Sequence, residues 1–187
     1  MKTLIILADS YKDSPSVDIA NEYEKGALEK NNQVKRINLS ELKFDLAPKS
    51  YTKNSSEKDI LRAQELLDWA THLVFIFPIT WAAVPAILKG FIDTAFVENF
   101  AFERDHVGEF IPLLIKKSAR LIVTGEESKW TQLFSVNPAI TMMKAAVLEH
   151  CGVSSVSVTY LGHVDELSNN EYQSILYQVF RLGLDEN

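Results

Sequence analysis

Short apolar runs alternate with longer segments of helical periodicity along the chain, and this alternation limits the fold more than any other sequence feature. The runs cover residues 3–8, 34–38, 73–77, 121–124 and 153–160. They are brief, rich in apolar and β-branched residues and bounded by turn residues, which predicts strands. The first and third are almost continuously apolar, as is typical of strands covered on both faces.

The intervening segments carry helix start signals. The expected caps are Ser16, Ser56 with Asp59, Asn137 before Pro138, and Ser168 with Glu171, and one further helix begins near Pro85. The core-facing residues are expected to be Ile60, Ala63, Leu67 and Ala70, then Ala139, Met142, Met143, Ala146 and Val147 before a stop at Gly152, and finally Tyr172, Ile175, Leu176, Val179 and Phe180. Five strands alternating with five helices predict an α/β fold with a parallel sheet and helices on both faces.

Length and charge limit the functions open to the chain. Its 187 residues predict a single domain over 1–187. There are 25 acidic and 19 basic residues, a net charge of −6, and the basic residues are scattered. Nucleic-acid binding normally needs a basic face, so no nucleic-acid partner is expected.

Cysteine and histidine usage excludes other classes of site. Cys151 is the one cysteine, so no disulfide within the chain can form. The four histidines are far apart and follow no metal-binding spacing, so no metal site is predicted. The apolar stretch near the start ends at Asp9, which is too short for a signal peptide, and the most apolar region, 73–88, contains two prolines and is too short to span a bilayer. These features predict a cytoplasmic protein without membrane insertion.

Ligands of parallel α/β sheets bind beyond the carboxyl ends of the strands, which directs attention to loops 9–18, 78–84 and 125–130. The first loop carries Ser10, Ser14 and Ser16 before a helix, and hydroxyls with free amides at a helix N-terminus can hold a phosphate. It lacks the glycines and the final GK[ST] of a P-loop. The alternative is that Ser14 and Ser16 only cap the helix.

The second loop lies in the string FPITWAAVPAILKGFIDTAF at residues 77–96. Trp81 places a broad apolar plate near a strand tip, and Ala82 and Ala83 leave the backbone accessible to a flat aromatic ligand. The alternative is a buried loop around Trp81, with Pro85 in the first turn of a helix. Phe77 and Pro78 stand where a response regulator would carry its phosphate-accepting aspartate, which excludes that class.

The string closely resembles the flavodoxin-like NAD(P)H:quinone oxidoreductases, the DT-diaphorase-like flavoproteins, which share its proline, tryptophan and V-P-A-x-L-K-G pattern. Weaker similarity covers most of the chain, including residues 99–102 and 162–165. The resemblance implies a flavodoxin-like three-layer fold and a flavin-dependent enzyme that transfers two electrons from NADH or NADPH to a small quinone-like aromatic acceptor. FMN is the expected cofactor, with FAD as the alternative.

The resemblance also implies the cofactor-binding residues. They are Asp9, Ser14, Ser16, Val17 and Asp18 near the flavin phosphate, Pro78, Ile79, Thr80, Trp81 and Ala82 along the isoalloxazine ring, and Thr124, Gly125 and Glu126 at its other edge, with Trp130 as a further aromatic residue. Backbone amides near Thr124 and Gly125 would stabilise negative charge on the reduced ring. No side chain is assigned as a catalytic acid or base.

Three residues depart from the family pattern. Asp9 replaces a histidine, Asp18 an asparagine, and Glu126 a glycine beside the ring, where an ionised carboxylate would lower the reduction potential. Asp18 and Glu126 leave open an alternative, a flavodoxin-like accessory subunit of a transporter without turnover. A simple electron carrier is a third reading.

The resemblance further implies a homodimer. Five phenylalanines crowd into residues 91–110, and so apolar a segment needs covering by the domain itself or by a second subunit. They are Phe91, Phe96, Phe100, Phe102 and Phe110.

Overall fold

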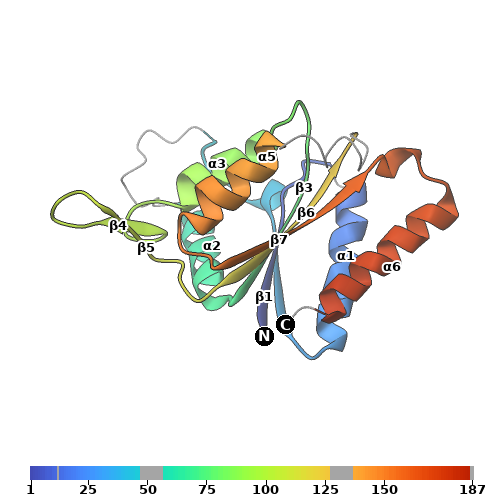
Figure 1. The fold of residues 1–187 in the computed structure, drawn as a ribbon, viewed down its shortest axis with the longest axis horizontal. Coiled ribbons are helices and arrows are strands. Elements are labelled where there is room, and N and C mark those ends of the chain that lie inside the picture. The colour runs from blue at the N-terminus through green and yellow to red at the C-terminus, as the bar shows by residue number, and fades with distance from the viewer. Residues whose placement is uncertain (12, 47–56, 127–136, 186–187) are drawn as a thin grey trace.

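A parallel sheet of five strands forms the centre of the computed structural model, which describes residues 1–11, 13–46, 57–126 and 137–185 (Figure 1). The strands are β1 (Lys2–Leu7), β2 (Gln33–Asn38), β3 (His72–Pro78), β6 (Ser118–Gly125) and β7 (Ser155–Gly162). Their order is β2-β1-β3-β6-β7, and every neighbouring pair is parallel. This is the strand order of flavodoxin-like folds, so the predicted fold class is confirmed.

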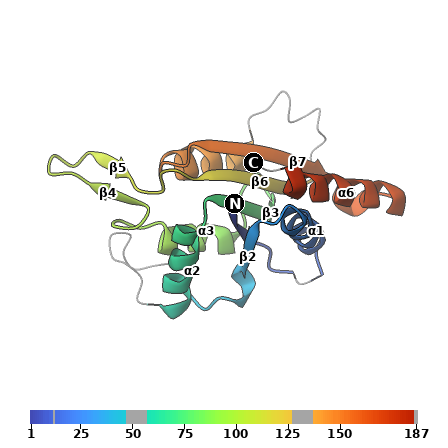
Figure 2. The ribbon, with the colours of Figure 1, turned by 90° about the horizontal axis from the view of Figure 1, so that it is seen from below.

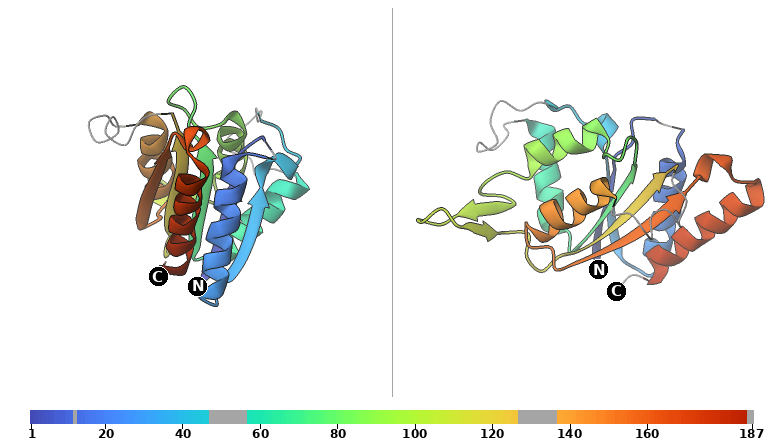
Figure 3. Two further views of the ribbon diagram at one scale, coloured as in Figure 1. Left: turned by 90° about the vertical axis from the view of Figure 1, so that its right-hand side faces the viewer. Right: turned by 45° about the horizontal axis from the view of Figure 1, so that its top comes forward.

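Helices cover both faces of this sheet. The helices α1 (Pro15–Glu29) and α6 (Asn169–Asp185) lie side by side on one face (Figure 3). The other face carries α2 (Lys58–Trp69), α3 (Ala86–Ala95), α5 (Pro138–Thr141) and the π-helix η2 (Met142–Glu149). Two 3₁₀ turns, η1 (Leu39–Glu41) and η3 (Val164–Glu166), follow β2 and β7. The three layers follow from strands that are apolar on both faces.

Strand β1 shows how the sequence builds the two halves of the core. Successive side chains of a strand point to opposite faces. Leu4 and Ile6 pack into the cluster beneath α2 and α3, while Ile5 and Leu7 pack into the cluster beneath α1 and α6. All four side chains are buried. The continuous apolar character of the segment is therefore explained by its central place in the sheet.

The predicted helix starts are confirmed in two cases. Glu171 accepts hydrogen bonds from the Ser168 amide and hydroxyl, which is the predicted capping box. Asn137 Oδ1 accepts a hydrogen bond of 3.0 Å from the Ala139 amide.

The other two expected caps are wrong. Helix α1 begins two residues earlier than expected, with Ser14 at the N-cap and Pro15 as its first residue, which leaves Ser16 inside the first turn. Helix α2 has Glu57 at its N-cap, and the Asp59 carboxylate accepts a hydrogen bond from the Lys43 amide instead of closing a capping box. Ser56 lies outside the described residues.

The helix after Asn137 differs from the prediction in its period. Residues 142–149 form a π-helix, in which hydrogen bonds join residues five apart rather than four. Met143 and Leu148 therefore share the buried face, whereas Ala146 is exposed and its predicted place in the core is wrong. The helix ends at Glu149, and Gly152 lies in the turn that follows, where its φ of +102° suits glycine.

An antiparallel hairpin that the sequence analysis did not predict joins α3 to β6. Its strands are β4 (Phe102–Arg104) and β5 (Phe110–Pro112), and it projects beyond the sheet (Figure 2). The Phe102 and Phe110 rings stack with centroids 4.6 Å apart, and Phe110 lies 4.0 Å from the His150 ring. Phe91 and Phe96 are buried in the core, so the five phenylalanines do not form one exposed surface. Among the described residues, no helix combines the length and the apolar character needed to cross a bilayer.

Candidate functional site

The carboxyl edge of the sheet holds a cleft of about 840 Å³. Four separate segments line it, because parallel strands end at the same edge. They are Asp9, Tyr11 and residues 13–16 after β1, residues 78–80 at the end of β3, residues 124–126 at the end of β6, and residues 163–166 after β7. The structure thus brings together most of the predicted residues, namely Asp9, Ser14, Ser16, Pro78, Ile79, Thr80, Thr124, Gly125 and Glu126. The segment after β7 was not predicted as part of the site.

Ser14 has an unusual position at the α1 end of this cleft. It occupies the N-cap, but its side chain makes no capping hydrogen bond. Its hydroxyl oxygen is buried and has no hydrogen-bond partner among the described residues. A buried polar atom without a partner costs about 1–3 kcal/mol, so such atoms mark places where a partner is missing. Together with the positive end of the α1 helix dipole, this hydroxyl fits a phosphate group.

The turn after β3 is strained and exposes Trp81. Thr80 and Ala83 exchange backbone hydrogen bonds of 3.3 and 3.0 Å, closing a two-residue turn around Trp81 and Ala82. Both central residues have positive φ, +54° and +55°, although neither is glycine. The left-handed conformation costs roughly 1–2 kcal/mol per such residue, and strain of this kind gathers at ligand sites.

The Trp81 side chain is 100% exposed to solvent, so the alternative of a buried loop is wrong. Pro85 stands at the N-cap of α3 rather than inside its first turn. The indole is thus held out beside the strand tips by backbone geometry and not by packing.

A smaller pocket of about 350 Å³ adjoins the cleft on the Trp81 side. It shares Ile79, Thr80, Gly125 and Glu126 with the cleft and is completed by Trp81, Ala82, Asn137 and Tyr160. Asn137 and Tyr160 were missed as site residues. Asn137 had a visible signal, the helix start at Asn137–Pro138, which places it at the carboxyl edge. Tyr160 had none, because its position depends on the register between β6 and β7.

Carboxylates dominate the charge of the cleft. Asp9, Asp13, Glu126, Asp165 and Glu166 line it, and His163 is the one basic side chain among the described lining residues. Asp9 is 5% exposed, and its Oδ1 accepts a hydrogen bond of 3.0 Å from the Tyr11 amide. His163 Nδ1 lies 3.3 Å from Glu166 Oε2. An anionic ligand in the cleft would therefore be repelled by charges of its own sign. Hydroxyl and amide hydrogen-bond donors would have to supply its affinity.

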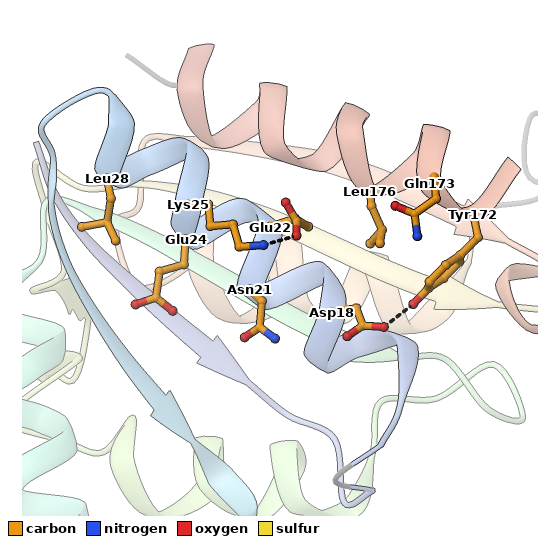
Figure 4. Close-up of a pocket in the computed structure, with 9 residues that line it drawn as sticks. All are labelled: Asp18, Asn21, Glu22, Glu24, Lys25, Leu28, Tyr172, Gln173 and Leu176. Atoms are coloured by element: carbon orange, nitrogen blue, oxygen red, sulfur yellow. Dashed lines mark hydrogen bonds and ion pairs between the residues drawn. The ribbon is translucent and has the colours of Figure 1, made fainter. Parts of the chain in front are cut away.

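Two predicted residues lie away from the cleft. Asp18 accepts a hydrogen bond of 2.8 Å from the Tyr172 hydroxyl in a separate groove of about 550 Å³ between α1 and α6 (Figure 4). Burial, reinforced by Asp18, raises the pKa of Tyr172 above its usual range. Val17 packs against the core beneath α1 and α6. Neither residue lines the cleft, so the Asp18 carboxylate does not face a phosphate held at the α1 end of the cleft.

Trp130 lies outside the described residues. Within the described part of the chain, no group of three or more His, Cys, Asp or Glu side chains could hold a metal ion. Burial raises the pKa of the Cys151 thiol to about 11, so at neutral pH this thiol is protonated and is a poor nucleophile.

Comparison with known proteins places these observations in a family. The model for the flavodoxin-like fold matches residues 1–178. The guinea pig (Cavia porcellus) NAD(P)H dehydrogenase [quinone] 1 is 30% identical over 121 residues, 61% of this chain and 44% of that protein, so the chain spans less than half of this relative. The uncharacterized NAD(P)H oxidoreductase YcaK of Escherichia coli is 27% identical over 188 residues, 94% of this chain and 93% of that protein.

Solved structures agree on the fold. Smu.1420 from Streptococcus mutans superposes with a TM-score of 0.85 at 28% identity, covering 99% of this chain and 100% of that one. An FMN-dependent NADH-azoreductase from Bacillus anthracis, solved in complex with FMN, gives a TM-score of 0.75 at 17% identity and covers 97% of both chains. At that identity the second likeness concerns the fold alone. By its sequence and its strand order, the chain belongs to the family of flavodoxin-like fold proteins.

Proposed function

We propose that the chain is a flavin-dependent oxidoreductase that binds FMN in the carboxyl-edge cleft and transfers two electrons from NADH or NADPH to a small quinone-like acceptor. The observation that carries the proposal is the buried Ser14 hydroxyl without a partner, at the α1 N-terminus inside the cleft. The names of the guinea pig and E. coli relatives support the electron donor, and the name of the guinea pig enzyme supports the acceptor. The FMN-bound Bacillus azoreductase, which shares the fold, supports FMN over FAD.

The proposal gives each segment of the cleft a task. Ser14, Ser16 and the first amides of α1 would hold the phosphate. The backbone of Pro78–Thr80 and the Trp81 indole would flank the ring, and the amides of Thr124–Glu126 would meet its other edge. The bound flavin supplies the two-electron chemistry.

The chain itself positions the ring and limits the access of water. Amides fixed at the tip of β6 stabilise negative charge that develops beside them, because they are oriented before the reaction begins. The Glu126 carboxylate opposes that charge and lowers the reduction potential of a ring bound there. We assign no side chain as a catalytic acid or base.

Three further expectations stay predictions: a cytoplasmic location, a homodimer, and the absence of a nucleic-acid partner. The exposed hairpin residues Val107 and Ile111, with Ile115 just beyond them, support a second subunit, because they are apolar and accessible. Sedimentation velocity at micromolar concentration tests the dimer, and a single monomeric species would contradict it.

One of the two residues that favoured the accessory-subunit alternative, Asp18, lies outside the cleft. That alternative assumed that the Asp18 and Glu126 carboxylates both weaken flavin binding. The Asp18 side chain instead accepts a hydrogen bond from Tyr172 in the α1–α6 groove. Only Glu126 lines the cleft. None of the relatives described above is named as a transporter subunit.

The absorption spectrum of the purified protein tests the proposal. We expect a yellow protein, or one that turns yellow on addition of FMN, whose flavin absorbance is bleached by NADH or NADPH without oxygen and returns on addition of menadione. Chromatography of the cofactor released by denaturation distinguishes FMN from FAD. A protein that takes up neither flavin contradicts the proposal, and one that binds flavin but is not reduced by either nucleotide is an electron carrier instead.

A further inference from the structure

Gly125, the last residue of β6, has no room for a side chain because Tyr160 fills the space beside it. A Cβ atom built on Gly125 would lie 2.6 Å from the Tyr160 hydroxyl oxygen and 3.3 Å from its Cε2 and Cζ atoms. The φ angle of Gly125 is not positive. The approach of the tyrosine tip, and not the backbone conformation, is therefore what favours glycine at this position.

Tyr160 reaches this position because it leans along the neighbouring strand. In the parallel ladder, Tyr160 pairs with Val123, and Gly125 pairs with Gly162. The tyrosine side chain thus extends two residues past its own partner, toward the carboxyl edge. Its ring packs on the core cluster beneath α3 and α5, and its side chain lines the smaller pocket beside Trp81.

Backbone contacts hold the same peptide from other directions. The Gly125 carbonyl accepts a hydrogen bond of 2.9 Å from the His163 amide, and the Thr124 carbonyl accepts one of 2.7 Å from the Ile79 amide. Tyr160 supplies the side-chain contact against the α-carbon of Gly125. The tip of β6 is therefore confined between β3, β7 and the tyrosine ring.

We infer that Tyr160 is a positioning residue of the flavin site, which fixes the Gly125–Glu126 peptide in the orientation that the bound ring meets. The inference rests on the proposed function. Amides stabilise developing charge only when they are held in place beforehand, so loosening this peptide weakens the binding of the reduced, more negative ring more than that of the oxidised ring. The reduction potential of the bound flavin reports that difference directly.

Substitution of Tyr160 by Leu removes both the ring and the hydroxyl. We expect oxidised FMN to bind within about threefold of wild type, and the affinity for reduced FMN to fall about tenfold more than that for oxidised FMN, which lowers the two-electron midpoint potential by about 30 mV. Tyr160→Phe keeps the ring against Gly125 and should shift the potential by less than half as much. Tyr177→Leu is the matched control, because Tyr177 is 62% exposed on α6 and does not line the cleft or the adjoining pocket.

A double variant tests the contact itself. Gly125→Ala drives a methyl group into the Tyr160 hydroxyl, so it should weaken FMN binding and lower the potential. Adding Tyr160→Phe removes the atom at 2.6 Å and leaves ring carbons at 3.3 Å, which can give way by a few tenths of an ångström. The double variant should therefore recover at least half of both losses, a non-additive result expected only of residues in contact.

The measurements are FMN affinity by fluorescence quenching, midpoint potential by dye equilibration, and thermal unfolding of each apoprotein. The inference is overturned if Tyr160→Leu, folded, leaves the potential at its wild-type value. It is equally overturned if the double variant binds FMN no better than Gly125→Ala. If the wild-type protein takes up no flavin, the proposed function is wrong and this inference fails with it. If the wild type and Tyr160→Leu both bind flavin with the same midpoint potential, only the inference is overturned.

Discussion

Helix α1 takes part in two regions of different character, a tightly packed seam with α6 and the end of the cleft at its N-terminus. Toward its C-terminus it packs against α6 backbone to backbone, since a side chain on Gly26 would overlap the Phe180 carbonyl and one on Gly183 would overlap the Tyr23 carbonyl. At the other end of the same helix pair, in the first turn of α1, the Tyr172 hydroxyl donates to Asp18 (Figure 4). At its N-terminus, by contrast, the buried Ser14 hydroxyl has no partner among the described residues.

The two regions also differ in backbone strain and exposure. The seam is built from regular helix, whereas the edge of the cleft carries Trp81 and Ala82 in the left-handed conformation and a fully exposed indole. Close packing with satisfied polar groups stabilises a fold, while strain and unsatisfied atoms need another reason to persist. Substitutions in the seam should therefore alter stability, and substitutions at the cleft should alter ligand binding.

The largest expected effect comes from breaking the seam. Gly183→Ala forces a methyl group into the backbone of α1, so the free energy of unfolding should fall by about 3 kcal/mol. Urea denaturation measures it, and Ser174→Ala, at an exposed position of α6, should change the free energy by less than about 0.5 kcal/mol. The folded fraction of Gly183→Ala should bind FMN as the wild type does. A stable Gly183→Ala protein would show that the helices are not packed this closely.

The second largest effect is expected from Trp81, at the cleft, and it concerns FMN affinity. Trp81→Ala removes the indole expected to stack on the ring, so FMN affinity should fall about thirtyfold, or about 2 kcal/mol. Unfolding should not change beyond about 0.5 kcal/mol, because the side chain is fully exposed. Trp81→Phe keeps an aromatic face and should retain most of the affinity. Fluorescence titration measures the FMN affinity of each variant. Equal affinity of Trp81→Ala and wild type would count against a flavin ring beside this turn.

Ser14→Ala should have a smaller effect, limited to phosphate. The lost hydrogen bond to a charged group should cost about 1.5 kcal/mol, the low end of the usual range, so FMN affinity should fall about tenfold while the affinity for riboflavin, which has no phosphate, stays the same. The unfolding free energy of the apoprotein should not decrease, because the hydroxyl makes no hydrogen bond within the described chain. Ser155→Ala, at the opposite edge of the sheet, is the control. An equal loss for FMN and riboflavin would place the phosphate elsewhere.

The smallest effect is a pH dependence between the same two helices. The pKa of Tyr172 is raised in the folded protein, first by burial and then by Asp18. Above the unfolded value of about 10, the unfolded chain loses this proton while the folded chain keeps it, so stability falls as pH rises. Tyr172→Phe should show a shallower decline between about pH 9 and pH 11 in urea midpoints. Parallel declines for the two proteins would mean that Tyr172 is as free to ionise folded as unfolded.

The fold was more predictable from sequence than the site. Continuous apolar runs such as residues 3–8 and 73–77 specify central strands, and the topology of parallel sheets then places their following loops at one edge. The period of the π-helix was not predictable, because Met143 and Leu148 fit a buried face only once the five-residue hydrogen bonds exist. The hairpin at Phe102–Pro112 was missed because its strands have only three residues each.

The site needed information that local sequence does not contain. Asp18 follows Ser16 by two residues, yet that step turns it around the helix from the cleft toward Tyr172. The turn at Trp81 contradicts local propensity, since neither it nor Ala82 is a residue that prefers positive φ. Tyr160 depended on the offset between two strands, which the chain fixes only in three dimensions.

The two-residue turn at Trp81 also has a thermodynamic consequence. Since its backbone hydrogen bonds already set the direction of the indole, a flat molecule arriving at the strand tips meets a ready-made wall and has no loop to reorganise. Such a pre-organised surface loses little conformational entropy when a ligand binds, so more of the stacking free energy is expressed as affinity.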